Sequence, residues 1–348
     1  MIDPDDMAYC RDAIRHGSLS FHAASRLLHP SVRDPALALY AFCRLADDEV
    51  DLKAEKAAAV LRLGERLDAV YAGRPRNAPP DRAFAAIVED FEMPRALPEA
   101  LLEGLAWDAM ERRYDTLSDL VAYSARVASA VGVMMAVLMR QRDADALARA
   151  CDLGVAMQLT NIARDVGEDA RENRMYLPLD WLEELEVDVE AFMANPQAQP
   201  DIRLCIARLL SEARQLYVRS EAGIAQLPLS CRPGIYAARF VYAGIGGQVR
   251  RAGHDSVSQR ARTGSWQKLG WLTWSLARTG LSMATPTSPR LYSRPLPETA
   301  FLVEAAAEGP RSNAEWSDTL CSVFTHLRQT DFERSAQMLP VPQTSKTQ

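Results

Sequence analysis

The sequence predicts an all-α protein. Almost every segment of the 348 residues carries apolar side chains at helical spacing. No run of alternating polar and apolar residues, bounded by hairpin turns, predicts a strand. Hydrophobic residues make up 48% of the chain, which is enough for a sizeable core. We therefore expect a single domain of packed helices.

The expected helices follow one another with short connections. The clearest internal break is the stretch 73–80, GRPRNAPP, whose glycine and prolines cannot continue a helix, and we expect a surface loop there. The helical pattern covers residues 4–16, 20–28, 34–52, 54–71, 81–91, 98–113, 117–139, 144–172, 182–193, 201–225, 235–251 and 266–283.

Proline density rises after residue 285, in the run TPTSPRLYSRPLPE. We expect the compact domain to cover residues 1–285. Residues 286–348 are predicted to be a Pro-rich linker and a C-terminal tail that is partly disordered.

Charge and cysteine content narrow the class of protein. The net charge is -6 and no basic block is present, so we expect no nucleic-acid partner. The six cysteines form no CxxC pair and predict reduced thiols. The N-terminus lacks the pattern of a secretory signal, and we find no apolar segment of about 18 residues. These features predict a cytoplasmic protein.

Polar residues form one stripe along the expected helix 144–172. Gln158, Asn161, Asp165 and Asp169 recur at steps of three and four, so they share one helix face. A second stripe in YAFCRLADDEVD contains, in order, Tyr40, Arg44, Asp47 or Asp48, and Asp51. Two acidic faces that meet across a cavity would hold divalent cations, and Mg²⁺ would bind a diphosphate there.

A solvated helix face is the alternative for the second stripe. For a lone acidic string of this kind, that interpretation is favoured about two to one. Gln158 and Asn161 change the balance, because they extend the other acidic stripe along further turns amid apolar neighbours. A helix face that only contacts solvent does not require amide side chains at these positions.

Four motifs carry a resemblance to a known family. They are SLSFHAASRLL from Ser18, ALYAFCRLADDEVD from Ala38, ERRYDTLSDLVAYSARVASAVG from Glu111 and QLTNIARDVGEDARENRMYLP from Gln158. The chain resembles the squalene/phytoene synthase family, and within it the bacterial phytoene synthases. The resemblance implies an isoprenoid-synthase-type helical bundle around a central substrate cavity, with residues 1–285 as the prenyltransferase catalytic domain.

The resemblance also implies roles for individual residues. Mg²⁺, with Mn²⁺ as a substitute, would be held by Asp47, Asp48, Asp51, Asn161, Asp165 and Asp169. Arg44 and Arg164 would clamp phosphate oxygens. The other residues expected to bind substrate are Ser18, Ser20, Phe21, Tyr40, Val127 and Gln158. The residues expected to act in catalysis are Asp47, Asp51, Asp165, Asp169, Tyr123 and Tyr242.

Two positions depart from the family pattern. Leu19 stands where the family commonly has Lys in its substrate loop, which removes one cation. Asn173 stands where the family often has Gly, and Asn tolerates left-handed backbone better than most residues.

Three tryptophans, Trp266, Trp271 and Trp274, lie close together in one segment. Core packing is the default for them, and peripheral membrane contact is the alternative.

The implied reaction is phytoene synthesis from two molecules of geranylgeranyl diphosphate, through prephytoene diphosphate, with release of diphosphate and without NADPH. One alternative is squalene or dehydrosqualene synthesis from farnesyl diphosphate, because the acidic stripes do not report the length of the substrate tail. A second alternative is a non-catalytic helical assembly factor, although such a protein would be expected to lose acidic stripe residues. The sequence leaves the oligomeric state open.

Overall fold

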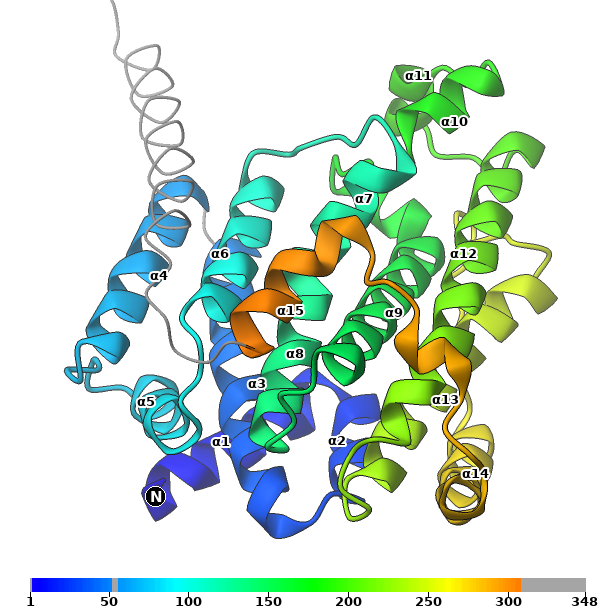
Figure 1. Cartoon of the computed structure of the whole chain (residues 1–348). Helices are drawn as coiled ribbons and strands as arrows, with labels where there is room; N and C mark the ends of the chain where they lie inside the picture. The colour runs from blue at the N-terminus through cyan, green and yellow to red at the C-terminus, as the bar shows by residue number, and fades with distance from the viewer. Residues whose placement is uncertain (1, 52–55, 308–348) are drawn as a thin grey trace, which may run out of the picture.

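The computed structural model describes residues 2–51 and 56–307 as an assembly of helices (Figure 1). No strand occurs among these residues, so the predicted all-α class is confirmed. The elements, including a π-helical turn η1 and the 3₁₀ turns η2 and η3, are α1 (Pro4–Gly17), α2 (Leu19–Ser25), α3 (Pro30–Asp51), α4 (Lys56–Tyr71), α5 (Pro79–Phe91), α6 (Ala96–Ala109), α7 (Leu117–Ser124), η1 (Ala125–Ser129), α8 (Ala130–Leu138), α9 (Ala144–Arg171), α10 (Leu179–Glu184), α11 (Val189–Ala194), α12 (Pro200–Ile224), α13 (Arg232–Arg251), α14 (Ser265–Ala284), η2 (Pro289–Tyr292), η3 (Pro297–Thr299) and α15 (Ala300–Ala307).

Local sequence signals set several helix ends. Asp143 caps α9 by accepting a hydrogen bond from the Ala146 amide, and Thr116 forms a capping box with Asp119 at the start of α7. The predicted break is confirmed for residues 73–78, whereas Pro79 and Pro80, predicted to lie in the loop, begin α5. Helix α4 ends at Tyr71, and Gly73 follows at a φ of 70°, a left-handed conformation that glycine adopts without steric cost.

Helix α9 runs through the middle of the molecule (Figure 1), with α12 and α13 on one side and α8 on the other. It joins two hydrophobic clusters. Leu147 and Cys151 belong to the cluster built mainly from α1, α3 to α6 and α8, whereas Leu159 and Ala163 belong to the cluster built mainly from α7 and α10 to α13. The stripe of polar residues on α9 therefore lies on a helix that the core holds on several sides.

The single helix predicted for 117–139 is divided by η1. Gly154 of α9 faces this turn so closely that a Cβ there would lie 2.5 Å from Cα of Ser129. The hydroxyl of Ser129 donates to the carbonyl of Cys151 at 2.8 Å. Small residues in this segment thus allow close helix packing. The expectation that no apolar segment reaches about 18 residues is wrong for Leu117–Leu138, which within the described residues is long and apolar enough to cross a membrane but is largely buried in the core.

The residues after 285 that the structure describes pack on the helical core. In Figure 1, α15 lies across α8 and α9, and η2 lies near α12. Arg149 of α9 is fully buried and donates from Nη1 to the carbonyls of Arg290, Leu291 and Ser293. Residues 286–307 therefore differ from the linker that their prolines predicted. The rest of the predicted tail, 308–348, lies outside the described residues.

Candidate active site

The stripe on α9 is continuous. Gln158, Asn161, Arg164, Asp165 and Asp169 all lie within α9, as the spacing predicted. Gly167 on the same helix packs against a loop. A Cβ at Gly167 would lie 2.5 Å from the Val257 carbonyl oxygen, so glycine is required for this close approach. The Gly167 amide also donates to the Ser256 carbonyl at 3.0 Å.

The loop on Gly167 brings a cation to the stripe. Arg260 contacts the carboxylate of Asp165 through Nε at 2.8 Å and Nη2 at 3.1 Å, and it forms an ion pair with Glu168 at 3.0 Å. Arg164 forms an ion pair with the same Asp165 carboxylate. Asp165 is thus held by two guanidinium groups, of which the sequence analysis identified only Arg164. No motif in the sequence around Arg260 marks it.

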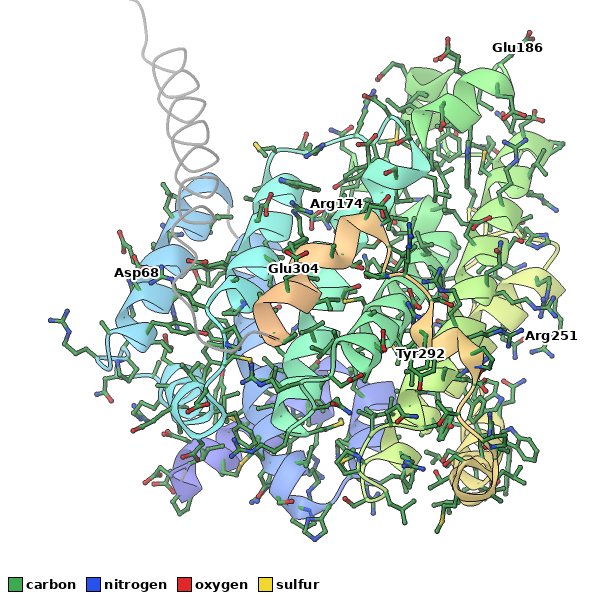
Figure 2. The ribbon with its side chains drawn as sticks, viewed as in Figure 1. Asp68, Arg174, Glu186, Arg251, Tyr292 and Glu304 are labelled. Carbon is green, nitrogen blue, oxygen red and sulfur yellow. The ribbon has the colours of Figure 1, made fainter. Side chains whose placement is uncertain are left out.

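Asp169 is a partly buried carboxylate with acidic neighbours. Burial raises the pKa of Asp169 to about 8, the charge of Asp165 adds to the rise, and Arg174, labelled in Figure 2, opposes it. One turn beyond Asp165 on the other side, the Oδ1 atom of Asn161 is buried, and no donor among the described residues reaches it. A group of oxygen atoms of this kind suits a hard divalent cation, because the cation would replace the missing positive charge and the missing donor.

The second stripe lies on α3. Arg44 and Asp48 form an ion pair at 2.6 Å, one helical turn apart. The positions of Asp47 and Asp51 are in α3, but their side chains lie outside what the structure describes. Within the described part, no three acidic, histidine or cysteine side chains converge on one point. The predicted metal set, which depends on Asp47 and Asp51, therefore stays a prediction, and the chemistry of the described members fits a divalent cation.

Aromatic rings connect the start of α2 to α3 and α13. Ser18 caps α2 by accepting a hydrogen bond from the Phe21 amide at 3.3 Å. The Phe21 ring lies 5.4 Å from the Tyr242 ring and 6.5 Å from the Tyr40 ring, measured between centroids. A Cβ at Gly17 would lie only 2.2 Å from the Tyr40 hydroxyl oxygen, so the C-terminal end of α1 lies close against α3. The side chain of Ser20 lies outside the described residues.

Tyr242 links these rings to the acidic stripe. Burial raises its pKa to about 12; the charge of Arg164 opposes the rise, and Tyr40 and Asp165 add to it. Side chains of α3 and α9 thus influence the pKa of the Tyr242 hydroxyl on α13. The structure therefore brings together Phe21, Tyr40, Arg164, Asp165 and Tyr242, which were predicted from separate motifs.

A second aromatic group surrounds Asp108. Tyr123 and Tyr176 donate to the two oxygens of this carboxylate at 2.8 and 2.7 Å, and their rings lie 5.3 Å apart. Tyr114 stacks on Tyr176 at 6.1 Å. Only Tyr123 was predicted as a site residue. Tyr176 lies inside the quoted MYLP segment, so the sequence contained a signal for it, whereas Asp108 stands among unremarkable helix residues.

Val127 lies in η1 rather than in a regular helix. A Cβ on Gly104 would lie 2.5 Å from its Cγ1 atom, so Val127 packs directly on α6. It also contacts the hydrophobic cluster that contains Tyr123 and Tyr242. Its predicted contact with substrate remains a prediction, and so does that of Gln158. Single π-turns such as η1 are frequent at functional sites.

Comparisons with known proteins show which family this sequence resembles. Residues 14–267 match the squalene/phytoene synthase family. The chain is 59% identical to the phytoene synthase of Cereibacter sphaeroides, over 97% of this chain and 98% of that protein. It is 58% identical to the phytoene synthase of Rhodobacter capsulatus, over 95% of this chain and 98% of that protein. A crystal structure of a dehydrosqualene synthase with ligand has 30% identity and a TM-score of 0.74, over 80% of this chain and 97% of that one.

Proposed function

The chain belongs to the squalene/phytoene synthase family, and from this premise we propose that it joins two molecules of geranylgeranyl diphosphate head to head to form phytoene. It is a prenyltransferase that uses prenyl diphosphates, and its place is in carotenoid synthesis. The high identity to phytoene synthases over nearly the full length of both chains supports the C20 substrate over the C15 alternative.

One observation supports diphosphate binding most directly. Asn161 presents a buried oxygen without a donor, on the same helix face as Asp165 and the high-pKa Asp169. Together with Asp47, Asp48 and Asp51, these residues would hold Mg²⁺ or Mn²⁺. When bound, the cation neutralises charge on the departing diphosphate and so assists ionisation of the allylic carbon.

The arginines would bind the phosphate oxygens. Arg44 and Arg164 each pair with a carboxylate of their own helix. Guanidinium groups form forked hydrogen bonds with phosphate as readily as with carboxylate, so both can exchange one partner for the other. Ser18, Ser20 and Gln158 would complete the polar contacts.

The aromatic residues would protect the cation during coupling. The C1–O bond of the first substrate breaks, and the double bond of the second substrate captures the allylic cation. Proton loss then gives prephytoene diphosphate, whose own diphosphate departs before the carbon skeleton rearranges to phytoene. Phe21, Tyr40, Tyr123 and Tyr242 would present ring faces to these cations and exclude water. Released diphosphate would accept the protons.

The proposal also covers the location of the enzyme in the cell and its need for a reductant. We assign the catalytic residues to 1–285 and propose that the enzyme works in the cytoplasm with a peripheral contact to a membrane. The reaction as proposed consumes no reductant, so no NADPH is expected.

The identity of the hydrocarbon tests the proposal. Purified protein is given Mg²⁺ and either geranylgeranyl or farnesyl diphosphate, without NADPH. We expect phytoene from the C20 substrate, and we expect Asp165→Asn and Asp51→Asn to abolish its formation while the helical circular dichroism stays unchanged. Glu212→Gln, at a partly exposed position of α12 outside the predicted site, serves as the control for loss of one carboxylate. A C30 hydrocarbon as the main product would instead support dehydrosqualene synthesis.

A further inference from the structure

Helix α14 packs with its hydroxyl groups inward. Ser275, Thr279 and Ser282 are buried, and their hydroxyls donate to backbone carbonyls of α14 itself. Arg278, on the same side, pairs with Glu221 of α12 at 3.1 Å. The inner side of α14 therefore contains polar groups that are satisfied within the protein.

The outer side of α14 is apolar. Trp266 and Trp274 are 85% and 53% exposed, and among the described side chains of this helix none of the exposed ones carries a charge. An amphipathic helix on the surface of a globular protein has the opposite orientation. We call this face the α14 outer face, and its large members are Trp266, Leu269, Trp274, Leu276, Leu281 and Met283.

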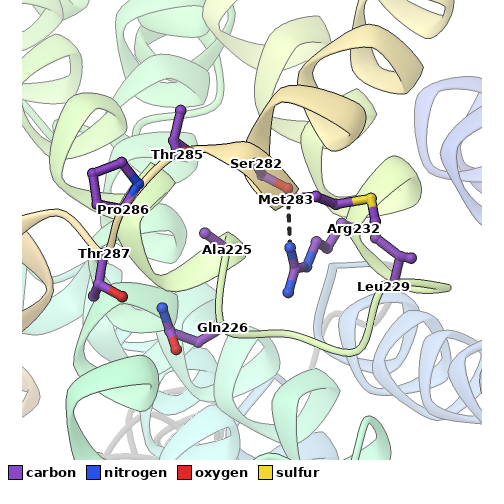
Figure 3. A pocket seen from close by; sticks show the side chains of 9 residues that line it. All are labelled: Ala225, Gln226, Leu229, Arg232, Ser282, Met283, Thr285, Pro286 and Thr287. Atoms are coloured by element: carbon purple, nitrogen blue, oxygen red, sulfur yellow. Dashed lines mark hydrogen bonds between the residues drawn. The ribbon is translucent and has the colours of Figure 1, made fainter.

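This arrangement requires an apolar partner. Burial of apolar surface stabilises by about 25 cal/mol per Å², and an apolar face of this size on one helix is unusual for a monomer in water. In Figure 1, α14 lies at the edge of the molecule beside α13. A recess of about 350 Å³ next to its C-terminal end is lined by Leu229, Arg232 and Met283, among others (Figure 3), and contains no predicted active-site residue.

The charge around α14 identifies the partner. Residues 256–297 contain six of the 40 basic residues of the chain and none of the 46 acidic ones. Arg260 and Arg278 are used in internal ion pairs. The other four, for which the described residues provide no ion-pair partner, are Arg262, Lys268, Arg290 and Arg294.

We propose that the α14 outer face docks on an anionic lipid bilayer. Tryptophans favour the interface between lipid and water, and lysine and arginine near the surface are each worth about 1 kcal/mol with anionic lipid. A second copy of this chain fits less well, because a symmetric contact would bring this basic segment against itself. In Figure 2, Tyr292 and Arg251 also point outward, on segments that flank α14.

The docking surface lies one helix away from the candidate active site. On the inner side of α14, Trp271 packs so closely on Gly244 that a Cβ there would lie 2.2 Å from its ring. Leu272 packs against Ala24 of α2 and Ala237 of α13. These are the helices that carry Phe21 and Tyr242. The inference rests on the peripheral membrane contact proposed above and names its surface and its lipid, and lipid binding can be measured without turnover.

A vesicle flotation experiment tests the docking surface. The purified full chain is mixed with vesicles containing phosphatidylglycerol or with vesicles of phosphatidylcholine alone. We expect the chain to float with the anionic vesicles, less so at high salt, and the double variant W266S/W274S to bind at least about tenfold more weakly. The matched control is Y9S/L204S, because Tyr9 and Leu204 are also exposed apolar residues but lie on α1 and α12.

Activity separates this inference from the proposed function. With substrate dispersed in detergent, W266S/W274S should retain wild-type turnover, because neither tryptophan lies in the candidate active site. Equal flotation of the wild type and the tryptophan variant would overturn the proposal, as would a wild type that floats with neither vesicle. A wild type that is dimeric in detergent-free solution, with a monomeric tryptophan variant, would assign the face to a second copy instead.

Discussion

Arg260 holds the carboxylate of Asp165 from a position 95 residues further along the chain, with Nε 2.8 Å from Oδ1 and Nη2 3.1 Å from Oδ2. Arg164 pairs with the same carboxylate. This carboxylate is a predicted metal ligand. A divalent cation at Asp165 would compete with both guanidinium groups, and a diphosphate bound beside it would provide them with new acceptors. We therefore expect Arg260 to bind substrate although no motif indicated it.

The first prediction concerns Arg260→Lys. Lysine keeps the charge and loses the forked geometry, so we expect KM for the prenyl diphosphate to rise about tenfold, which corresponds to about 1.4 kcal/mol. Steady-state kinetics with saturating Mg²⁺ measures the change. The control is Arg208→Lys, because Arg208 forms an equally forked pair with Glu184 on the surface. Identical kinetics for both variants would show that Arg260 has only a structural role.

The sequence predicted the parts of the site that depend on helical spacing. A stripe such as Gln158 to Asp169 follows from the period of the helix, and the left-handed backbone anticipated for Asn173 is confirmed by its φ of 60°. Arg260 and Asp108 depend on tertiary contacts between distant segments. Periodicity does not report such contacts, so neither residue was found.

The outward orientation of Trp266 and Trp274 illustrates the same limit. Their spacing within the segment predicts a helix, and core packing is the usual location of such large side chains. Which side of the helix faces the core is decided by the neighbours α12 and α13. The sequence of α14 contains apolar residues on the outer side and hydroxyls on the inner side, so composition alone favoured the wrong orientation for these two residues.

The second prediction concerns Asp169→Asn. Burial, with the charge of Asp165, raises the pKa of Asp169 from its ordinary value of 3.8 to about 8. Between these values the unfolded chain has lost the proton that the folded chain retains, so stability falls as pH rises from about 4 to about 8. Asparagine removes this slope. We expect the variant to be inactive and, at pH 9 without metal, more stable than the wild type by at least about 2 kcal/mol, since each pKa unit is worth about 1.4 kcal/mol.

Asp152→Asn provides the contrast for that measurement. Asp152 is fully buried, whereas Asp169 is partly buried, and Asp152 pairs with Arg149 at 2.7 Å and with Arg219 at 3.1 Å. Loss of its charge leaves a buried guanidinium without its counter-ion, so this variant should be destabilised at every pH. Urea denaturation with EDTA, at pH 6 and pH 9, compares the two. If Asp169→Asn also lost stability at pH 9, Asp169 would not be a destabilised carboxylate.

The third prediction concerns Tyr123→Phe. The Tyr123 hydroxyl donates to Asp108, which also accepts a hydrogen bond from Tyr176. Phenylalanine keeps the ring and removes one donor from a partly buried carboxylate, so we expect a loss of about 1–3 kcal/mol in the free energy of unfolding. Tyr242→Phe, whose hydroxyl makes no such contact with Asp108, should cost less. Denaturation measures both, and equal losses would contradict the assigned role of the Tyr123 hydroxyl.

The last prediction tests whether residues 286–307 are part of the folded core. Arg149 has no exposed surface, pairs with Asp152 and donates to three carbonyls between residues 290 and 293. Arg149→Met removes all of these contacts and leaves the buried Asp152 carboxylate with the more exposed Arg219 as its counter-ion, so we expect a loss of about 3 kcal/mol. It should also make the chain after residue 285 accessible to trypsin. The double variant R149M/D152L has neither buried charge of this pair. Much of the unfolding free energy lost in Arg149→Met should therefore return, while the chain after residue 285 stays accessible to trypsin. A single variant that unfolds like the wild type would mean that the arginine does not fasten this segment.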